Sequence, residues 1–297
     1  MVQAGGKQAS MDGYAPPPSF AGIEATGDRI CYILDLSDSM LTPLRPSELE
    51  KFPKGPVTGG GAVRLEKESR NKQWKKAFEA VDWSKVKHRI DAARELLKAS
   101  LLQLDEEQSF SVLWFGDEAG SLGSTKGLVK ASLANVRAVF KEIDAIQAGP
   151  GAENRPHGTL RGKTNLHGAL HRAFKLRGRG SVGAGENVDA STWEEGCDTL
   201  FVLTDGAPTW DDWAARDQRD PEDHAGDPET GGKLANTPTL IFQSPFMHPG
   251  CILDEATRLN LFRKVEIHCV GMGEATMNTF ERLAFLGRGE AISLSGG

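Results

Sequence analysis

Runs of apolar residues alternate along this chain with stretches whose apolar residues recur every three or four positions. The apolar runs have the length of buried strands and lie at 30–34, 109–115, 197–203 and 265–270. A weaker strand is expected at 128–129 and a last one at 290–294. The helical spacing recurs at about 83–104, 134–146, 166–176, 252–262 and 278–286. Strands separated by helices predict a three-layer α/β fold, with a doubly wound, mostly parallel sheet flanked by helices.

Turn-rich segments divide this pattern. Residues 1–19 are rich in Gly, Ser and Pro and predict a disordered arm or linker, and residues 20–297 predict one domain, with Phe20–Ile23 as a possible short edge strand. Two long insertions are expected, at about 41–83 and 207–250. Each leaves the carboxyl end of a strand, so we expect both on the same face of the sheet. The first is basic over 66–81 and the second is acid-rich, so the two would be able to pair.

Composition excludes several classes of protein. The formal charge of −6 and the pI near 5.7 argue against a protein that binds nucleic acid by neutralising phosphates. No apolar stretch approaches the roughly 20 residues of a membrane span, and no signal peptide is visible at the start of the chain. The four cysteines form no C-x-x-C pair, which predicts free thiols in a reducing compartment, with the cytoplasm as the default.

Oxygen-bearing side chains follow the first core strand. Asp35, Ser37 and Ser39 alternate at its carboxyl end, so an extended or gently turning backbone points all three the same way. Open α/β sheets place their ligands at this edge. Thr164 comes just before a later predicted helix, and Asp205 follows the strand at 197–203. Carboxylate and hydroxyl oxygens suit a hard divalent cation such as Mg²⁺.

The succession of D-x-S-x-S, a lone Thr and an Asp-Gly resembles the metal-ion-dependent adhesion site (MIDAS) of von Willebrand factor type A domains, over about residues 20–295. A Phe-x-Gly-Ile sequence before the first strand is similar to that of bacterial members. The resemblance implies that Ser37, Ser39 and Thr164 bind the ion directly, and that Asp35 and Asp205 bind it directly or through water. The implied ion is Mg²⁺, with Mn²⁺ or Ca²⁺ as alternatives.

The resemblance also implies a function without catalysis. An open coordination position on the cation would accept an Asp or Glu carboxylate of a partner protein. The alternatives are a scaffold or assembly subunit with a structural site, and a regulatory subunit of an ATPase or chelatase complex. A simpler interpretation is that the serines cap the next element and Asp205 begins a turn. A lysine ammonium that filled the open position, or side chains that did not converge, would overturn the adhesive interpretation.

Other motifs carry less weight. The G-x-G-x-x-G at 178–183 follows a helix rather than a strand, so it does not predict dinucleotide binding. His167 and His171 have the spacing of a zinc pair. However, Gly168 stands where a zinc protease has its glutamate, and no third ligand is evident, so surface or hydrogen-bonded histidines are expected. No G-x-S-x-G motif occurs, and we expect no catalytic residues.

Overall fold

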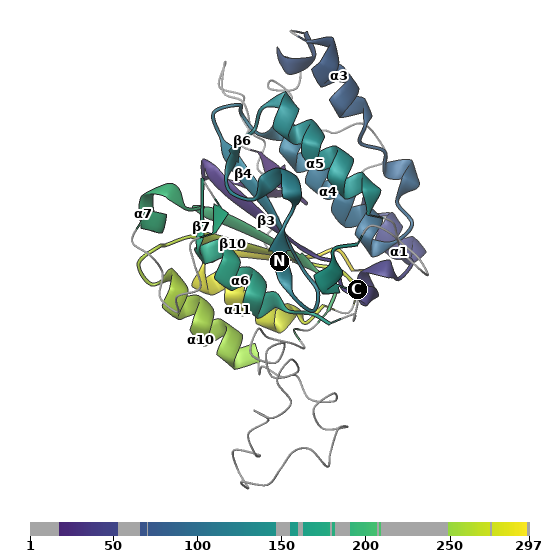
Figure 1. Cartoon of the computed structure of the whole chain (residues 1–297). Coiled ribbons are helices and arrows are strands. Elements are labelled where there is room, and N and C mark those ends of the chain that lie inside the picture. Colours follow the sequence, from purple (N-terminus) through teal and green to yellow (C-terminus); the bar gives the residue numbers. More distant parts are fainter. Residues whose placement is uncertain are drawn as a thin grey trace, which may run out of the picture.

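A six-stranded path of hydrogen-bonded strands forms the centre of the molecule, with helices on both faces (Figure 1). The computed structural model describes residues 18–52, 66–69, 71–146, 155–159, 163–178, 180–181, 191–206, 208, 249–273 and 275–295. Along the sheet the strands follow the order β11 (Arg288–Ser293), β10 (Glu266–Gly271), β9 (Thr199–Thr204), β3 (Arg29–Asp35), β4 (Ser109–Phe115) and β5 (Ala119–Ser121). The first five run parallel, while β5 and the short β6 (Val129–Lys130) both pair antiparallel with β4.

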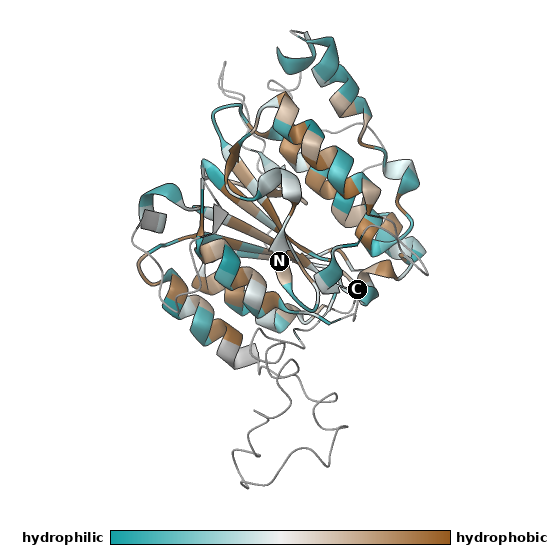
Figure 2. Ribbon diagram, viewed as in Figure 1, coloured by the Kyte–Doolittle hydropathy of each residue, from teal (hydrophilic) through white to brown (hydrophobic). Residues whose placement is uncertain are grey.

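Two layers of helices bury the two faces of this sheet. One layer consists of α4 (Arg89–Gln103) and α5 (Leu133–Ala145), and the other of α6 (Leu166–Phe174), α10 (Pro249–Asn260) and α11 (Met277–Leu286). Strand β3 shows the division, because Tyr32 packs in the core beneath the first layer and Ile33 in the core beneath the second. The strands are coloured hydrophobic over most of their length in Figure 2. The predicted three-layer, doubly wound fold class is therefore confirmed.

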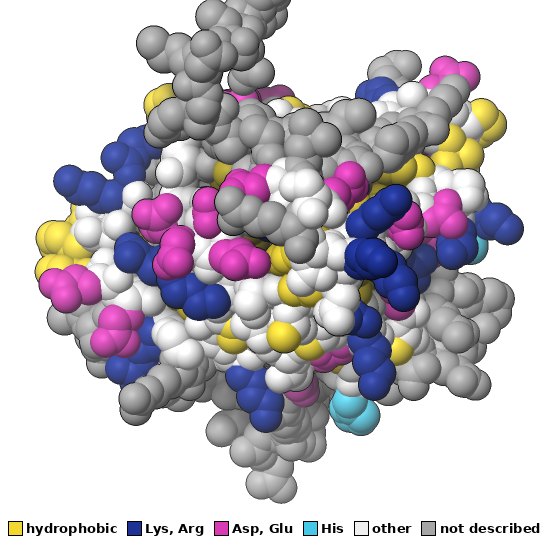
Figure 3. Space-filling view, turned by 90° about the horizontal axis from the view of Figure 1, so that it is seen from above, with side chains coloured by type: hydrophobic (Ala, Val, Ile, Leu, Met, Phe, Trp, Pro, Cys, Tyr) yellow, Lys and Arg dark blue, Asp and Glu magenta, His cyan; other side chains and the backbone are white. Residues whose placement is uncertain are grey.

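Smaller elements connect the strands of the sheet and the helices of the two layers. They are the hairpin strands β1 (Ser19–Phe20) with β2 (Ile23–Glu24) and β7 (Leu176–Arg177) with β8 (Gly180–Ser181), the helices α1 (Pro46–Leu49), α3 (Lys72–Glu79) and α7 (Ser191–Glu195), and the 3₁₀-helices η1 (Asp38–Leu41), η2 (Trp83–Lys85), η3 (Gly123–Thr125) and η4 (His157–Thr159). On the face shown in Figure 3, basic and acidic side chains are interspersed.

Two expected elements differ in their ends or partners. The helix expected from about residue 83 begins at Arg89, because His88 and Asp91 form a capping box at that point. Residues 83–85 form a separate 3₁₀-helix, capped by Asp82. The Phe20–Ile23 segment is not an edge strand of the main sheet. Positive φ angles at Ala21 (53°) and Gly22 (93°) turn it into a hairpin, β1–β2.

Residues 66–69 and 71–79 of the first insertion lie away from the carboxyl edge of the sheet, which differs from our expectation for them. Residues 41–52 stay at that edge, where Thr42 accepts from the N–H of Arg89 and Lys51 donates to the carbonyl oxygen of Ser295, just after β11. The Lys67 Nζ donates to the carbonyl oxygens of Leu102 and Leu104, at the far end of α4. The same ammonium lies 4.2 Å from the centroid of the Trp74 ring in α3. Because α4 starts near the carboxyl edge and runs to the opposite edge, α3 lies away from the predicted metal site.

Several predictions concern residues that the structure describes only in part. The expected arm lies outside the described residues up to residue 17, and so does nearly all of the second insertion, including its tryptophans and acidic run. Cys31, Cys197 and Cys269 are buried free thiols. Within the described ranges, no helix is both long and apolar enough to span a bilayer.

Candidate metal centre

The D-x-S-x-S segment folds back on itself at the end of β3. The Asp35 Oδ1 atom accepts a hydrogen bond from the backbone N–H of Ser37, at 2.8 Å. Its Oδ2 atom accepts from the hydroxyl of Thr204, at 2.6 Å, at the end of the neighbouring strand β9. The hydroxyl oxygens of Ser37 and Ser39 lie 3.0 Å apart. The three side chains therefore lie together, because the chain turns into the 3₁₀-helix η1 after Ser37 and does not continue as an extended strand.

Asp205 and Thr164 join this group from distant parts of the chain. The Ser39 hydroxyl donates to Asp205 Oδ1 at 2.7 Å. The hydroxyl oxygens of Ser39 and Thr164 are both 3.9 Å from the point where a side chain on Gly206 would begin. Both therefore border the same small space, and all five residues predicted from the sequence meet at the carboxyl edge of the sheet.

The turn between β4 and β5 positions Thr164. The backbone N–H of Asn165 donates to the carbonyl oxygen of Gly116, at 2.7 Å. The N–H of Lys163 donates to Asp117 Oδ1, at 3.0 Å. The Asn165 side chain also caps α6 by accepting from the N–H of Gly168. Thr164 is thus held on both sides by backbone hydrogen bonds.

The spacing of the oxygens suits an octahedral cation. Neighbouring ligands of a Mg²⁺ ion, each roughly 2.1 Å from the metal, lie roughly 3.0 Å from one another. The pairs Ser37–Ser39 and Ser39–Asp205 match this spacing, at 3.0 and 2.7 Å. The donor set consists of oxygen atoms only, which Mg²⁺, Mn²⁺ and Ca²⁺ prefer. The residues present therefore fit a hard divalent ion.

The electrostatic environment of the Asp35 and Asp205 carboxylates favours a positive charge beside them. Burial and the nearby Asp205 carboxylate raise the pKa of Asp35 from 3.8 to about 7, although the hydrogen bonds from Ser37 and Thr204 oppose the rise. Asp35 and Asp205 are 0% and 2% exposed. Two buried carboxylates in such proximity are costly unless a cation compensates them.

The sequence analysis did not identify a basic side chain that compensates part of this negative charge. Arg89, in the first turn of α4, donates from Nη1 to Asp205 Oδ2 at 2.6 Å. The guanidinium contacts only one of the two carboxylate oxygens, while the other faces the serines. The signal was present in the sequence, because a helix that follows a parallel strand begins at the carboxyl edge of the sheet. A basic residue in its first turn is therefore a candidate neighbour of the site.

A second arginine secures the loop around the site. Arg155 pairs with Asp38 through Nη1, at 2.6 Å, and donates through Nη2 to the carbonyl oxygen of Leu36, at 2.7 Å, and to that of Thr159. Asp38, which interrupts the two serines, thus has a partner outside the cation site, and its carboxylate is more than half exposed (57%). Asp35 therefore belongs to the oxygen cluster, whereas Asp38 pairs with Arg155 outside it.

The fold and this arrangement define a doubly wound α/β domain with an oxygen-lined site at the carboxyl edge of its sheet. The structure is similar to 41 chains of known structure, among them a protein described as von Willebrand factor type A from Catenulispora acidiphila. That match has 12% sequence identity and a TM-score of 0.38, and it covers 91% of this chain and 39% of the other. The chain thus spans well under half of the length of that protein. No protein-family model and no curated protein matches the sequence.

Proposed function

We propose that this chain is a non-enzymatic protein-interaction module that docks a partner through a divalent cation. Asp35, Ser37, Ser39, Thr164 and Asp205 would hold the ion, with Mg²⁺ as the first choice and Mn²⁺ or Ca²⁺ as alternatives. The observation that carries this proposal is the pair of buried carboxylates beside three hydroxyl groups, at an edge where open α/β sheets bind ligands.

The chain's own residues have distinct tasks in this proposal. When bound, the ion supplies an electrophilic position for an Asp or Glu carboxylate of the partner. The three hydroxyl groups are neutral, so they neutralise none of the ion's charge. Asp35 is oriented by Ser37 and Thr204, and Arg89 holds one oxygen of Asp205 and withdraws part of its charge. Each of these features keeps the ion attractive to an incoming anion.

The contact between Arg89 and Asp205 favours a second candidate function. A cation built into the chain compensates one carboxylate without any metal, as expected of a structural site in a scaffold or assembly subunit. In that case the partner would bind elsewhere, and the site would serve only the stability of the fold. Binding that persists in EDTA, together with a drop in thermal stability on metal removal, would identify this role.

Selection from a library of displayed random peptides tests the first proposal. Peptides bound in Mg²⁺ and released by EDTA are expected to share an Asp or Glu, and changing that residue to Asn or Gln should abolish binding. The variants Asp35→Ala and Thr164→Ala should lose the peptides and retain the circular dichroism spectrum of the fold. Asp38→Ala is the matched control, because this exposed carboxylate lies in the same loop outside the cation site, and Arg155 would keep its hydrogen bonds to the carbonyl oxygens of Leu36 and Thr159. Peptides that need no acidic residue, or that stay bound in EDTA, would contradict the proposal.

A further inference from the structure

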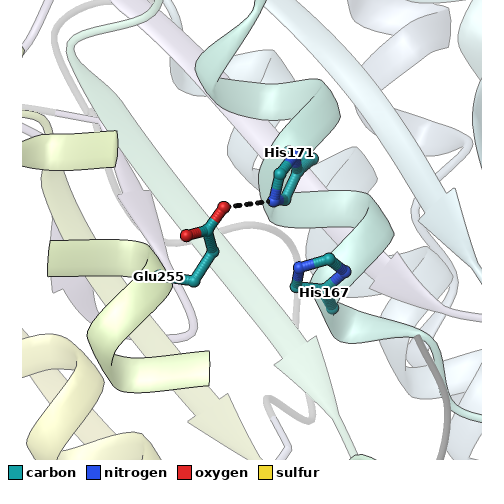
Figure 4. Close-up of side chains that lie close together, drawn as sticks. All are labelled: His167, His171 and Glu255. Atoms are coloured by element: carbon teal, nitrogen blue, oxygen red, sulfur yellow. Dashed lines mark ion pairs between the residues drawn. The ribbon is translucent and has the colours of Figure 1, made fainter. Parts of the chain in front are cut away.

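A second group of metal-ligating side chains lies between α6 and α10, outside the site described above. Figure 4 shows His167 and His171 projecting from α6 toward Glu255, which comes from α10. One potential ligand atom from each of the three lies within 4.8 Å of those of the other two. The residue that the sequence pattern lacked as a third ligand is therefore supplied by a helix far along the chain.

The geometry of the three side chains is already close to that of a shared ligand set. The two histidines are four residues apart and lie on one face of the helix, with ring centroids 4.4 Å apart. The Nε2 atom of His171 is 2.7 Å from Glu255 Oε1. Three ligands in a tetrahedral zinc site, each roughly 2.0–2.1 Å from the metal, lie roughly 3.3 Å from one another. Small side-chain rotations would therefore bring all three within reach of one ion.

Both histidines lie largely inside the protein. His167 is buried, at 2% exposure, which excludes the surface position as one of the two alternatives expected from the sequence, a surface or a hydrogen-bonded histidine. His171 is also partly buried, with 17% of its side chain exposed, so both imidazoles lie where the protein would limit the access of solvent to an ion.

Glu255 also has a neighbour that would orient it. Arg258, one turn further along α10, donates from Nε to Oε2 at 2.7 Å and from Nη2 to Oε1 at 2.6 Å. A carboxylate oxygen has two lone pairs, so Oε1 is able to accept from Arg258 and bind an ion at the same time. Hydrogen-bonded neighbours of this kind are typical of metal-binding carboxylates.

We propose that His167, His171 and Glu255 form a binding site for a divalent transition-metal ion, with Zn²⁺ as the expected occupant. Two imidazoles and one carboxylate favour such an ion over Mg²⁺ or Ca²⁺, so this site differs in chemistry from the oxygen-only site. The fourth position would be filled by water, because His171 and Glu255 are both partly exposed, at 17% and 19% of their side chains.

The position of this second site in the fold predicts what the ion would do. It would link α6, which begins two residues after Thr164, to α10, which begins at the end of the second insertion. An ion that binds both helices in the folded state and has no comparable site in the unfolded chain stabilises the fold. Zn²⁺ loading should therefore raise the melting temperature of the whole protein.

The experiment measures Zn²⁺ binding to the full chain by calorimetry, in an Asp35→Ala background that removes a predicted ligand of the oxygen-only site. One equivalent of Zn²⁺ should bind. The substitutions His171→Leu and Glu255→Gln should each weaken binding by more than the roughly 10–100-fold that losing a neighbour of a ligand costs. His157→Leu is the matched control, because this histidine is exposed on η4 and its loss should leave binding unchanged. Circular dichroism of the metal-free variants verifies that each one folds.

Substitution with Co²⁺ identifies the ligands. A four-coordinate site of two imidazoles and a carboxylate should give the strong visible absorption of tetrahedral Co²⁺, and His171→Leu should remove it. The proposal is overturned if both variants bind Zn²⁺ as tightly as the parent. It is also overturned if the spectrum is the weak one of six-coordinate Co²⁺ or contains thiolate charge-transfer bands, which would place the ion on oxygen ligands or on a cysteine.

Discussion

Arg89 and Asp205 form a buried ion pair, with Nη1 of the arginine 2.6 Å from Oδ2 of the aspartate and side chains that are 9% and 0% exposed. Gly273 accommodates the guanidinium, because a Cβ atom at this position would lie 2.2 Å from the Arg89 Cζ atom. The φ angle of Gly273 is also positive, at 56°. The turn that follows β10 therefore contacts the guanidinium that binds Oδ2 of Asp205. This leaves the other carboxylate oxygen toward Ser39.

Replacing the arginine should make the fold depend on added cation. Arg89→Met keeps much of the apolar side chain but leaves the Asp205 carboxylate buried without its partner, which costs about 3–5 kcal/mol. We expect the metal-free variant to melt well below the parent. Mg²⁺ should raise its melting temperature by more than it raises that of the parent, because the ion then replaces the lost positive charge.

The control for this experiment is Arg94→Met in the same helix. Arg94 is also largely buried and pairs with Asp91, Glu95 and Asp144, away from the cation site. This variant should lose stability but keep the parent's response to Mg²⁺. If Arg89→Met and the parent gain equally from Mg²⁺, then Arg89 and the ion do not act on the same carboxylate.

Asp35→Asn should have opposite effects in the absence and presence of metal. The rise in the pKa of Asp35 from 3.8 to about 7 means that its ionised form destabilises the metal-free fold, by up to about 4 kcal/mol above pH 7. The neutral amide avoids this cost, and the Thr204 hydroxyl is able to accept from its nitrogen. The metal-free variant should therefore be more stable than the parent at pH 8.

Saturating Mg²⁺ should reverse this order, because the amide is a weaker ligand for a hard cation. Urea unfolding of both proteins at pH 8, with EDTA and with Mg²⁺, measures the four stabilities. A parent that is more stable than the variant even in EDTA would show that Asp35 supports the fold without a cation.

The sequence predicted the parts of the site that depend on local pattern and on topology. Asp35, Ser37 and Ser39 follow one strand and Asp205 another, and parallel strands bring their carboxyl ends to one edge. Thr164 lies just before a helix, and only the resemblance to a known metal site links it to the other four. In the structure, its hydroxyl oxygen and that of Ser39 are each 3.9 Å from the point where a side chain on Gly206 would begin. Strand topology thus accounts for four of the five residues, and the resemblance to a known site added the fifth.

The sequence did not reveal the residues whose positions depend on how a helix packs against its neighbours. Arg89 lies in the first turn of α4 because that helix begins at residue 89, whereas the helix expected from about residue 83 would have placed it in the second turn. Glu255 approaches His171 because α10 packs beside α6, and no periodicity along the chain encodes this contact. Strand β5 has only three residues, one of them Gly120, which gives no hydrophobic run to detect.

The β1–β2 hairpin should be needed for the stability of the whole fold. The Phe20 ring is fully buried, with its centroid 5.4 Å from that of Tyr32 and 5.3 Å from that of Phe201. We expect Phe20→Ala to lower the free energy of unfolding by about 3–5 kcal/mol, as for other buried aromatic residues. Phe285→Ala is the control, because this ring is 81% exposed and its loss should change stability by about 0.5 kcal/mol or less. Denaturant titration measures both, and similar values for the two would contradict the hairpin's role.

His268 should make the stability of the protein depend on pH. Its ring is buried in β10, stacks on Phe201 with centroids 4.8 Å apart, and accepts at Nδ1 from the N–H of Glu290, at 3.0 Å. Burial lowers its pKa below 6.5, although Glu266 and Glu290 oppose this shift. As the pH falls below 6.5, the unfolded chain therefore takes up the proton first. The stability that neutral His268 contributes is present above pH 6.5 and is lost as the pH falls toward the folded-state pKa.

Replacing His268 with a residue that does not titrate should weaken the dependence of stability on pH. His268→Gln should lose less stability between pH 7 and pH 5 than the parent does, and the two slopes should differ by up to about 1.4 kcal/mol per pH unit. Urea unfolding across this range measures the slopes. His157→Gln should follow the parent, because that side chain is exposed. Equal slopes for the parent and His268→Gln would mean that the buried ring accepts its proton as readily as one in the unfolded chain, since the carboxylates of Glu266 and Glu290 would then offset its burial.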